Sequence, residues 1–119
     1  MNTIETLFVP YELAVKLKEL GFDEPCLGNY RLPTNRLITE WEIKNTPENC
    51  LGVSAPTFSQ AFRFFREKYG FYVIINPSIN NDFTCVIWTS KRQYHIGVFP
   101  SPEEAELACL VKLISIVEQ

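Results

Sequence analysis

The chain has 119 residues, which is the usual size of a single domain. Hydrophobic residues make up 46%, charged residues make up 21%, and the formal net charge is −3. This composition excludes a disordered acidic tail and a strongly basic nucleic-acid-binding protein. No apolar run reaches the ~18 residues of a membrane helix, and residues 1–9 lack the Lys or Arg of a secretory signal. We therefore expect one folded domain in the cytoplasm, away from membranes.

The N-terminal half predicts a helix followed by a hairpin. The helix begins at Pro10 and runs to Leu20, and Gly21 offers a left-handed ending against which Phe22 can fold back. Two strand-like segments follow, and the second alternates apolar and polar residues with the period of a half-buried strand. These segments are residues 30–32 and 36–43. Segment 44–56 is rich in Asn, Pro and Gly and predicts a loop.

The C-terminal half predicts a helix, three strands and a last helix. Residues 57–69 carry an apolar stripe with helical spacing, and Gly70 ends that helix. The strands are expected at residues 71–75, 83–89 and 93–99, antiparallel because their connections are short. Ser101, Pro102 and Glu104 mark the start of a helix that is apolar on most sides. The predicted fold class is α+β, with helices packed on an antiparallel sheet in the order α-β-β-α-β-β-β-α.

The cysteines are Cys26, Cys50, Cys85 and Cys109, and His95 is the only histidine. No CxxC pair supplies the local ligands that zinc sites usually have, so we expect no metal and no cofactor. Cys85 and Cys109 lie in apolar segments and are expected to be small buried hydrophobes, with all four thiols reduced. The topology allows one nucleophilic pair, Cys85 with His95, and a buried cysteine beside a half-exposed histidine is the favoured alternative.

Local charge indicates one candidate protein-binding site on the second helix. Arg63 and Arg66 are neighbours there, away from the apolar stripe, and Phe64 also lies off that stripe. An exposed aromatic side chain near two arginines is typical of a partner-binding site. The alternative is that Phe64 only widens the buried face of the helix. The chain has neither a phosphate-binding glycine loop nor a nucleophile elbow, and no catalytic constellation is recognisable, so we expect no enzyme.

A second candidate site lies on the three-stranded sheet. The strand–helix junction at residues 97–108 resembles that of the small DNA-binding domains of plant ethylene-response factors and phage endonucleases. Those domains read DNA from the sheet, and the residues here that suit this role are Trp88, Lys91, Arg92 and His95. The helix–three strands–helix order is also similar to double-stranded-RNA-binding domains. In those domains lysines grip phosphate at the start of the last helix, where this chain has Glu103 and Glu104.

Three segments spread over most of the chain point to one family. They are PYELA continuing to KELGFDEPC (residues 10–26), SAPTFSQAFR continuing to YG (residues 54–70) and EEAELACL (residues 103–110). Together they resemble a family of small uncharacterised proteins of Bacteroides-type gut bacteria and their phages or prophages. The resemblance implies a cytoplasmic accessory protein of a mobile element, and it supplies no activity and no catalytic residue.

Two hypotheses follow from the sequence. In the first, the chain is a non-enzymatic interaction module that binds a host or phage protein, or itself as a homodimer, through Arg63, Phe64 and Arg66. In the second, it is a nucleic-acid-binding accessory domain that uses the sheet.

Overall fold

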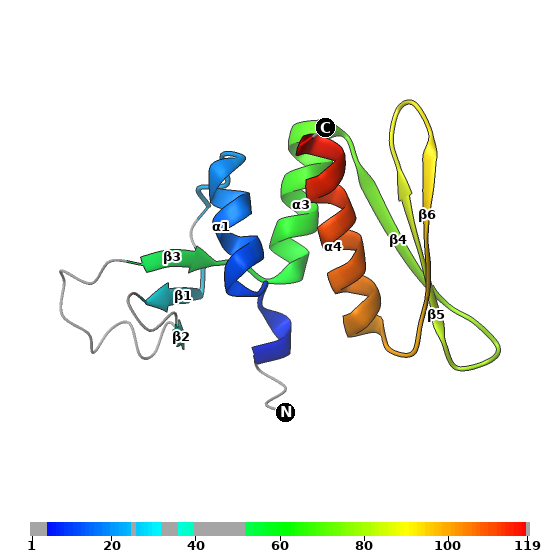
Figure 1. Ribbon diagram of the computed structural model, residues 1–119, viewed down its shortest axis with the longest axis horizontal. Helices are drawn as coiled ribbons and strands as arrows, with labels where there is room; N and C mark the ends of the chain where they lie inside the picture. Colours follow the sequence, from blue (N-terminus) through cyan, green and yellow to red (C-terminus); the bar gives the residue numbers. More distant parts are fainter. Residues whose placement is uncertain (1–4, 25, 32–35, 40–51, 119) are drawn as a thin grey trace. The chain divides into compact units, whose positions relative to one another are not determined.

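The computed structural model divides the chain into two compact units (Figure 1). The units are Met1–Ser59 and Gln60–Gln119, and the residues described are 5–24, 26–31, 36–39 and 52–118. The elements are η1 (Glu5–Leu7), α1 (Tyr11–Glu19), β1 (Gly28–Arg31), β2 (Arg36–Thr39), β3 (Gly52–Ala55), α3 (Phe58–Tyr69), β4 (Tyr72–Pro77), β5 (Phe83–Trp88), β6 (Gln93–Phe99) and α4 (Pro102–Glu118). Two three-stranded antiparallel sheets and their helices confirm the α+β class and the predicted order, with one additional strand. Within the described ranges, no helix is long and apolar enough to cross a membrane.

The helix α1 begins at Tyr11, one residue later than predicted, because Pro10 is its N-cap and has a non-helical ψ of 154°, and the helix ends as its sequence predicts. Gly21 has a φ of 104°, in the left-handed region that glycine enters without a Cβ clash. The Phe22 N–H donates to the Leu17 carbonyl at 3.0 Å, and the Gly21 N–H donates to the Lys18 carbonyl at 3.0 Å. These are the two hydrogen bonds of a Schellman ending, and they turn the chain out of the helix so that Phe22 is buried.

The sheet of the first unit has the order β2-β1-β3, with both pairings antiparallel. The β1–β2 pairing confirms the predicted hairpin, with Tyr30 opposite Leu37. The buried Tyr30 hydroxyl donates a 2.6 Å hydrogen bond to the Val9 carbonyl, and its ring meets Tyr11 edge-on at 5.6 Å between centroids. Tyr30 therefore ties the central strand to α1 and to the segment before it. Residues 40–43 of the predicted second strand lie outside the described residues.

The strand β3 lies in a segment that the sequence predicts as a loop. It has four residues, Gly52–Ala55, and Val53 lies opposite Tyr30 of β1. Glycine and alanine have low strand propensity, and four residues are too few to show a clear alternation. Pairing with β1, which is a tertiary contact, therefore makes this segment a strand. The rest of the predicted loop, residues 44–51, lies outside the described residues.

The helix α3 follows β3 and carries the predicted apolar stripe. It begins at Phe58, and Gly70, with a φ of 73°, follows its last residue as predicted. Three members of the stripe, Phe58, Ala61 and Phe65, are buried, and the other two, Phe62 and Tyr69, are half-buried. The helical spacing of apolar residues thus identifies the buried side of α3.

The sheet of the second unit has the order β4-β5-β6, antiparallel as predicted. One of its faces packs on α4 around Cys85, Ala105 and Cys109, and we call this the inner face. The half-buried hydrophobic residues around this cluster are Phe62, Val73, Ile75, Phe83, Ile96 and Phe99. The β5–β6 register shifts by one residue, because Gly97 lies opposite Cys85 whereas His95 lies opposite Val86. This bulge on β6 uses a φ of 143° at Gly97, which suits glycine.

The start of α4 confirms the predicted capping box. The Glu104 N–H donates to Ser101 Oγ at 3.2 Å, and the Ser101 hydroxyl donates to the Glu104 carboxylate at 3.0 Å. Pro102 occupies the first helical position, where its missing N–H breaks no helical hydrogen bond. Glu103 and Glu104 add negative charge at the positive end of the helix dipole.

Replacing Ser101 with alanine is expected to lower the free energy of unfolding by about 1 kcal/mol, because the Glu104 N–H loses its partner. Chemical denaturation followed by circular dichroism measures the change. Ser101→Thr is the matched control, since a threonine hydroxyl accepts from the Glu104 N–H, donates to the Glu104 carboxylate and should retain most of the wild-type stability. Equal losses in both variants would contradict the assignment of Ser101 as the cap.

The structure joins Cys85 of β5 to Cys109 of α4 in a disulfide, with the Cα atoms 6.7 Å apart. The expectation that all four cysteines are reduced is therefore wrong for this pair. Both residues are fully buried, which confirms that part of the prediction. The bond forms because Cys85 lies on the inner face of β5, where α4 packs and presents Cys109. That contact is tertiary, and cysteine spacing does not reveal it.

Candidate functional site

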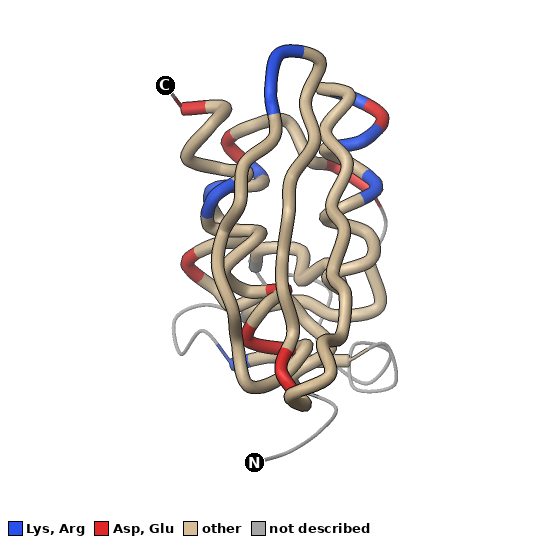
Figure 2. Tube along the Cα trace, turned by 90° about the vertical axis from the view of Figure 1, so that its right-hand side faces the viewer, with Lys and Arg blue, Asp and Glu red and all other residues tan. Residues whose placement is uncertain are grey.

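The sheet face opposite the inner face carries exposed aromatic and aliphatic side chains, and we call it the outer face. Alternation along the strands assigns to it Tyr72, Ile74, Asn76, Thr84, Val86, Trp88, Gln93, His95 and Val98. Tyr72 is 54% exposed, Trp88 is 45% exposed and Val98 is 61% exposed. Figure 2 shows this sheet with its strands tan along their length, because β4, β5 and β6 contain no Lys, Arg, Asp or Glu.

The register of the strands places these side chains in rows across the outer face. Tyr72 lies opposite Trp88, so two large aromatic side chains are neighbours at one end. In the next row Ile74 lies opposite Val86, which in turn lies opposite His95. Directly opposed side chains have Cβ atoms about 4.5–5.5 Å apart, so each row forms a continuous surface. An exposed surface with aromatic residues and without charge resembles the centre of a protein–protein interface.

The basic turn between β5 and β6 holds Lys91 and Arg92 and is the blue segment at the top of Figure 2. The Arg92 guanidinium lies 5.2 Å from the ring centroid of Tyr94, and the Lys112 ammonium lies 5.2 Å from the same centroid. Tyr94 lies opposite the buried Ile87 and therefore belongs to the inner side of the sheet. The Arg92 side chain is thus engaged at the inner side and away from the outer face.

The structure consequently divides the four residues predicted for nucleic-acid binding. Trp88 and His95 are exposed on the outer face. Trp88 lies opposite Gln93 of β6, and His95 follows two residues later on that strand. Lys91 is exposed on the turn beside Trp88, whereas Arg92 packs over Tyr94. Trp88 and His95 therefore share the outer face, whereas Lys91 and Arg92 both line a pocket with Tyr94 at the turn.

The candidate site on α3 is also only partly assembled. Arg63 and Arg66 are exposed, as the sequence predicts. Phe64 is 8% exposed, and its ring contacts Phe65 edge-on at 5.3 Å between centroids. The interpretation of Phe64 as an exposed binding residue is therefore wrong, and the alternative, that it widens the buried face, is correct. The reason is that α3 buries more than one narrow stripe, which a single helical period does not show. Without Phe64, the two arginines remain as a charged surface of α3.

The nucleophilic pair that the sequence allows, Cys85 with His95, does not form in the structure. Cys85 is bonded to Cys109 and is buried on the inner face, whereas His95 is exposed on the outer face. Cys85 therefore has no thiolate to act as a nucleophile, and the two side chains point to opposite sides of the sheet. Among the described residues, no group of three or more His, Cys, Asp or Glu side chains is placed to hold a metal ion.

Two described side chains have clearly shifted pKa values. Burial raises the pKa of the Cys26 thiol to about 11, and the negative charge of Glu24 adds to the shift. The thiol donates to the Glu24 carbonyl at 3.3 Å. Burial also raises the pKa of Glu106 on α4, with a further contribution from Glu103. Neither group has a partner arrangement typical of catalysis, and a raised cysteine pKa makes the thiol less reactive.

Cys26 is therefore expected to react with iodoacetamide about 100-fold more slowly than an unperturbed thiol at neutral pH. The reason is that the pKa is about 11 instead of 9.0, so the thiolate fraction is lower by that factor. Mass spectrometry of the Cys26 peptide gives the rate between neutral and alkaline pH, with a free cysteine peptide as the reference. The rate should keep rising up to about pH 11, and a plateau below pH 9 would contradict the shift.

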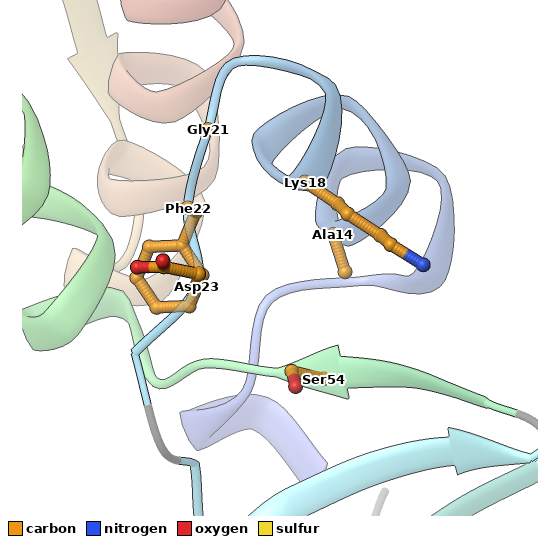
Figure 3. Close-up of a pocket in the computed structure, with 6 residues that line it drawn as sticks. All are labelled: Ala14, Lys18, Gly21, Phe22, Asp23 and Ser54. Carbon is orange, nitrogen blue, oxygen red and sulfur yellow. The ribbon is translucent and has the colours of Figure 1, made fainter.

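A pocket of about 460 Å³ opens in the first unit beside the end of α1 (Figure 3). It is lined by Ala14, Lys18, Gly21, Phe22, Asp23 and Ser54. In Figure 3 the Lys18 side chain extends away from Asp23, so the two charges do not converge on one point. Its three polar side chains, those of Lys18, Asp23 and Ser54, are all exposed. A binding site usually has convergent polar groups, and this pocket does not show them.

Sequence reasoning identified Trp88 and His95 but missed the exposed apolar residues of the outer face, Tyr72, Ile74 and Val98. The segment 71–75 is apolar throughout, so it lacks the alternation of apolar and polar residues that would show which side is exposed. The position of Cys85 in β5 is a usable signal, because a free cysteine is usually buried. Side chains alternate between the two faces of a strand, so Val86 and Trp88 should lie on the face opposite Cys85.

Comparison of the chain with protein-family models, with curated proteins and with solved structures found no match. The candidate site therefore rests on the geometry of the second unit.

Proposed function

We propose that this protein is a non-enzymatic interaction module that binds a partner protein through the outer face of the β4–β5–β6 sheet. The observation that carries the proposal is the exposed pair Tyr72 of β4 and Trp88 of β5, on a sheet whose three strands contain no Lys, Arg, Asp or Glu. Aromatic residues and a lack of charge at the centre distinguish protein interfaces from ordinary surface. The resemblance to proteins of phages and prophages supports, within this proposal, an accessory role in a mobile element.

The chemistry of the surface specifies the partner. Apolar side chains of the partner would cover Ile74, Trp88 and Val98, since the removal of apolar surface from water favours association. The partner that fits is a protein segment with an apolar centre.

A nucleic-acid partner is the second candidate, and one observation favours it. Tyr72 and Trp88 lie side by side next to the basic turn, and bases stack on exposed aromatic rings of this kind. Against it, Arg92 is engaged with Tyr94, Lys91 lines a pocket with the same tyrosine, and the strands of the outer face contain no Lys or Arg. Phosphate contacts supply most non-specific affinity for nucleic acids, so this surface suits a protein better.

The test places a photo-crosslinking amino acid at Trp88 in the living source cell. A matched control has it at Ile79, which is 99% exposed but lies in the β4–β5 turn, outside the outer face. The proposal expects a discrete protein adduct at position 88 and none at position 79. The purified partner should then bind the wild-type chain at least about tenfold more tightly than the Trp88→Ala variant, because interface tryptophans are frequent hot spots. Equal binding by both would overturn the proposal.

A further inference from the structure

The side of α4 that does not pack on the sheet forms a shallow groove with the edge of β6, about 610 Å³ in volume. Its lining residues are Ile96, Phe99, Glu104, Leu107, Ala108, Val111, Lys112 and Ser115. Leu107 and Val111 lie one helical turn apart on the same side of α4. Their side chains are 38% and 49% exposed. The groove is distinct from the outer face, which lies on the other side of the sheet.

The charges along this groove are arranged symmetrically about its centre. Glu104 lies at one end and Lys112 at the other, eight residues or about 12 Å apart along the helix. The midpoint of these two residues is position 108, and the midpoint of Leu107 and Val111 is position 109. A two-fold axis close to positions 108 and 109 relates the helix to an antiparallel copy, so that Glu104 lies near the copy's Lys112 and the apolar residues lie near each other.

We therefore propose that the α4 groove is a homodimer interface whose occupant is the α4 helix of a second copy of this chain. A two-fold interface uses the same surface patch on both copies, so the patch must be complementary to itself. The groove meets this requirement in both charge and apolar content, because its acidic and basic ends exchange places under the rotation. This inference goes beyond the proposed function and uses none of the residues of the outer face.

The edge of β6 explains why helix packing is favoured over a continuous intermolecular sheet. In the described part of the chain β6 pairs with β5 alone, which leaves its other side open. The bulge at Ile96 and Gly97 interrupts regular hydrogen bonding in the middle of that strand, and bulges protect edge strands from pairing with another chain. Ile96 and Phe99 instead line the groove beside α4, where they can contact the side chains of a second helix.

The test is sedimentation equilibrium of the full chain over a range of concentrations. The expected result is a reversible dimer with twice the 13.8 kDa mass of one chain. Leu107→Asp and Val111→Asp should each raise the dimer dissociation constant at least tenfold, because a carboxylate then occupies the apolar centre. Ile79→Asp and Val98→Asp are matched controls, exposed apolar positions outside the groove that should leave the dissociation constant unchanged.

Charge exchange separates the proposal from a general loss of stability. Lys112→Glu alone should weaken the dimer, because it opposes Glu104 of the other copy with a second acid. Adding Glu104→Lys should restore the wild-type dissociation constant, although the second change also alters the capping box. Circular dichroism must show that each variant is folded. A strictly monomeric wild type, a dimer that Val98→Asp breaks instead, or a double variant that fails to regain affinity while folded would overturn the proposal.

Discussion

Replacing Phe65 with alanine is expected to lower the free energy of unfolding by about 3–5 kcal/mol. Phe65 is fully buried in α3, with ring centroids 5.3 Å from Phe64 and 5.8 Å from Tyr69. The Tyr69 ring in turn stacks on Phe71 at 5.6 Å, so Phe65 belongs to a connected aromatic cluster. Alanine removes the apolar area of the ring, leaves a cavity and also removes the ring–ring contacts. All of these changes lower the free energy of unfolding.

Urea denaturation followed by far-ultraviolet circular dichroism measures the effect of this substitution. Arg66→Ala is the matched control, since Arg66 follows Phe65 on the same helix but is exposed. Surface substitutions usually change stability by less than about 0.5 kcal/mol. A Phe65→Ala variant as stable as Arg66→Ala would contradict the placement of Phe65 in the core.

Breaking the Cys85–Cys109 disulfide is expected to lower the free energy of unfolding by about 3 kcal/mol. The bond closes a loop with a sequence separation of 24 residues, and this restricts the unfolded chain. It also joins the central strand β5 to α4 at the centre of the cluster around Ala105. Reduction would therefore release the cross-link that holds β5 to α4 in the second unit.

Denaturation with and without a thiol reductant tests this expectation. The double variant Cys85→Ala, Cys109→Ala is the control, because the reductant should have no further effect on its stability. Digestion of the non-reduced protein should also yield a peptide pair joined through these two cysteines. Recovery of both as separate, alkylated peptides would show that the bond is absent.

Local patterns predicted most elements of this fold, since helix endings and strand alternation depend on neighbouring residues. The Schellman ending at Gly21 and the capping box at Ser101 are examples, and both form as expected. The strand β3 and the disulfide escaped prediction because each depends on a partner distant in sequence, β1 for Gly52–Ala55 and α4 for Cys85. Tertiary contacts of this kind leave little trace in a single sequence.

The candidate sites were harder to predict than the fold, because they depend on which way each side chain points. Phe64 lies off the principal stripe of α3 but is still buried. Arg92, which the sequence predicts for a nucleic-acid site on the sheet, instead packs over Tyr94 on the inner side. Charge and aromatic content along the chain identified the right strands, but the faces became clear only from the strand register.

The most direct test of the central claim, that the outer face binds protein, is a titration of the pure chain with labelled DNA and RNA. Single- and double-stranded forms are used at low and at near-physiological salt. The account predicts no micromolar binding even at low salt, because the strands of this face contain no Lys or Arg. Micromolar binding that weakens steeply with salt and is lost in Trp88→Ala would contradict the account and favour a nucleic-acid partner.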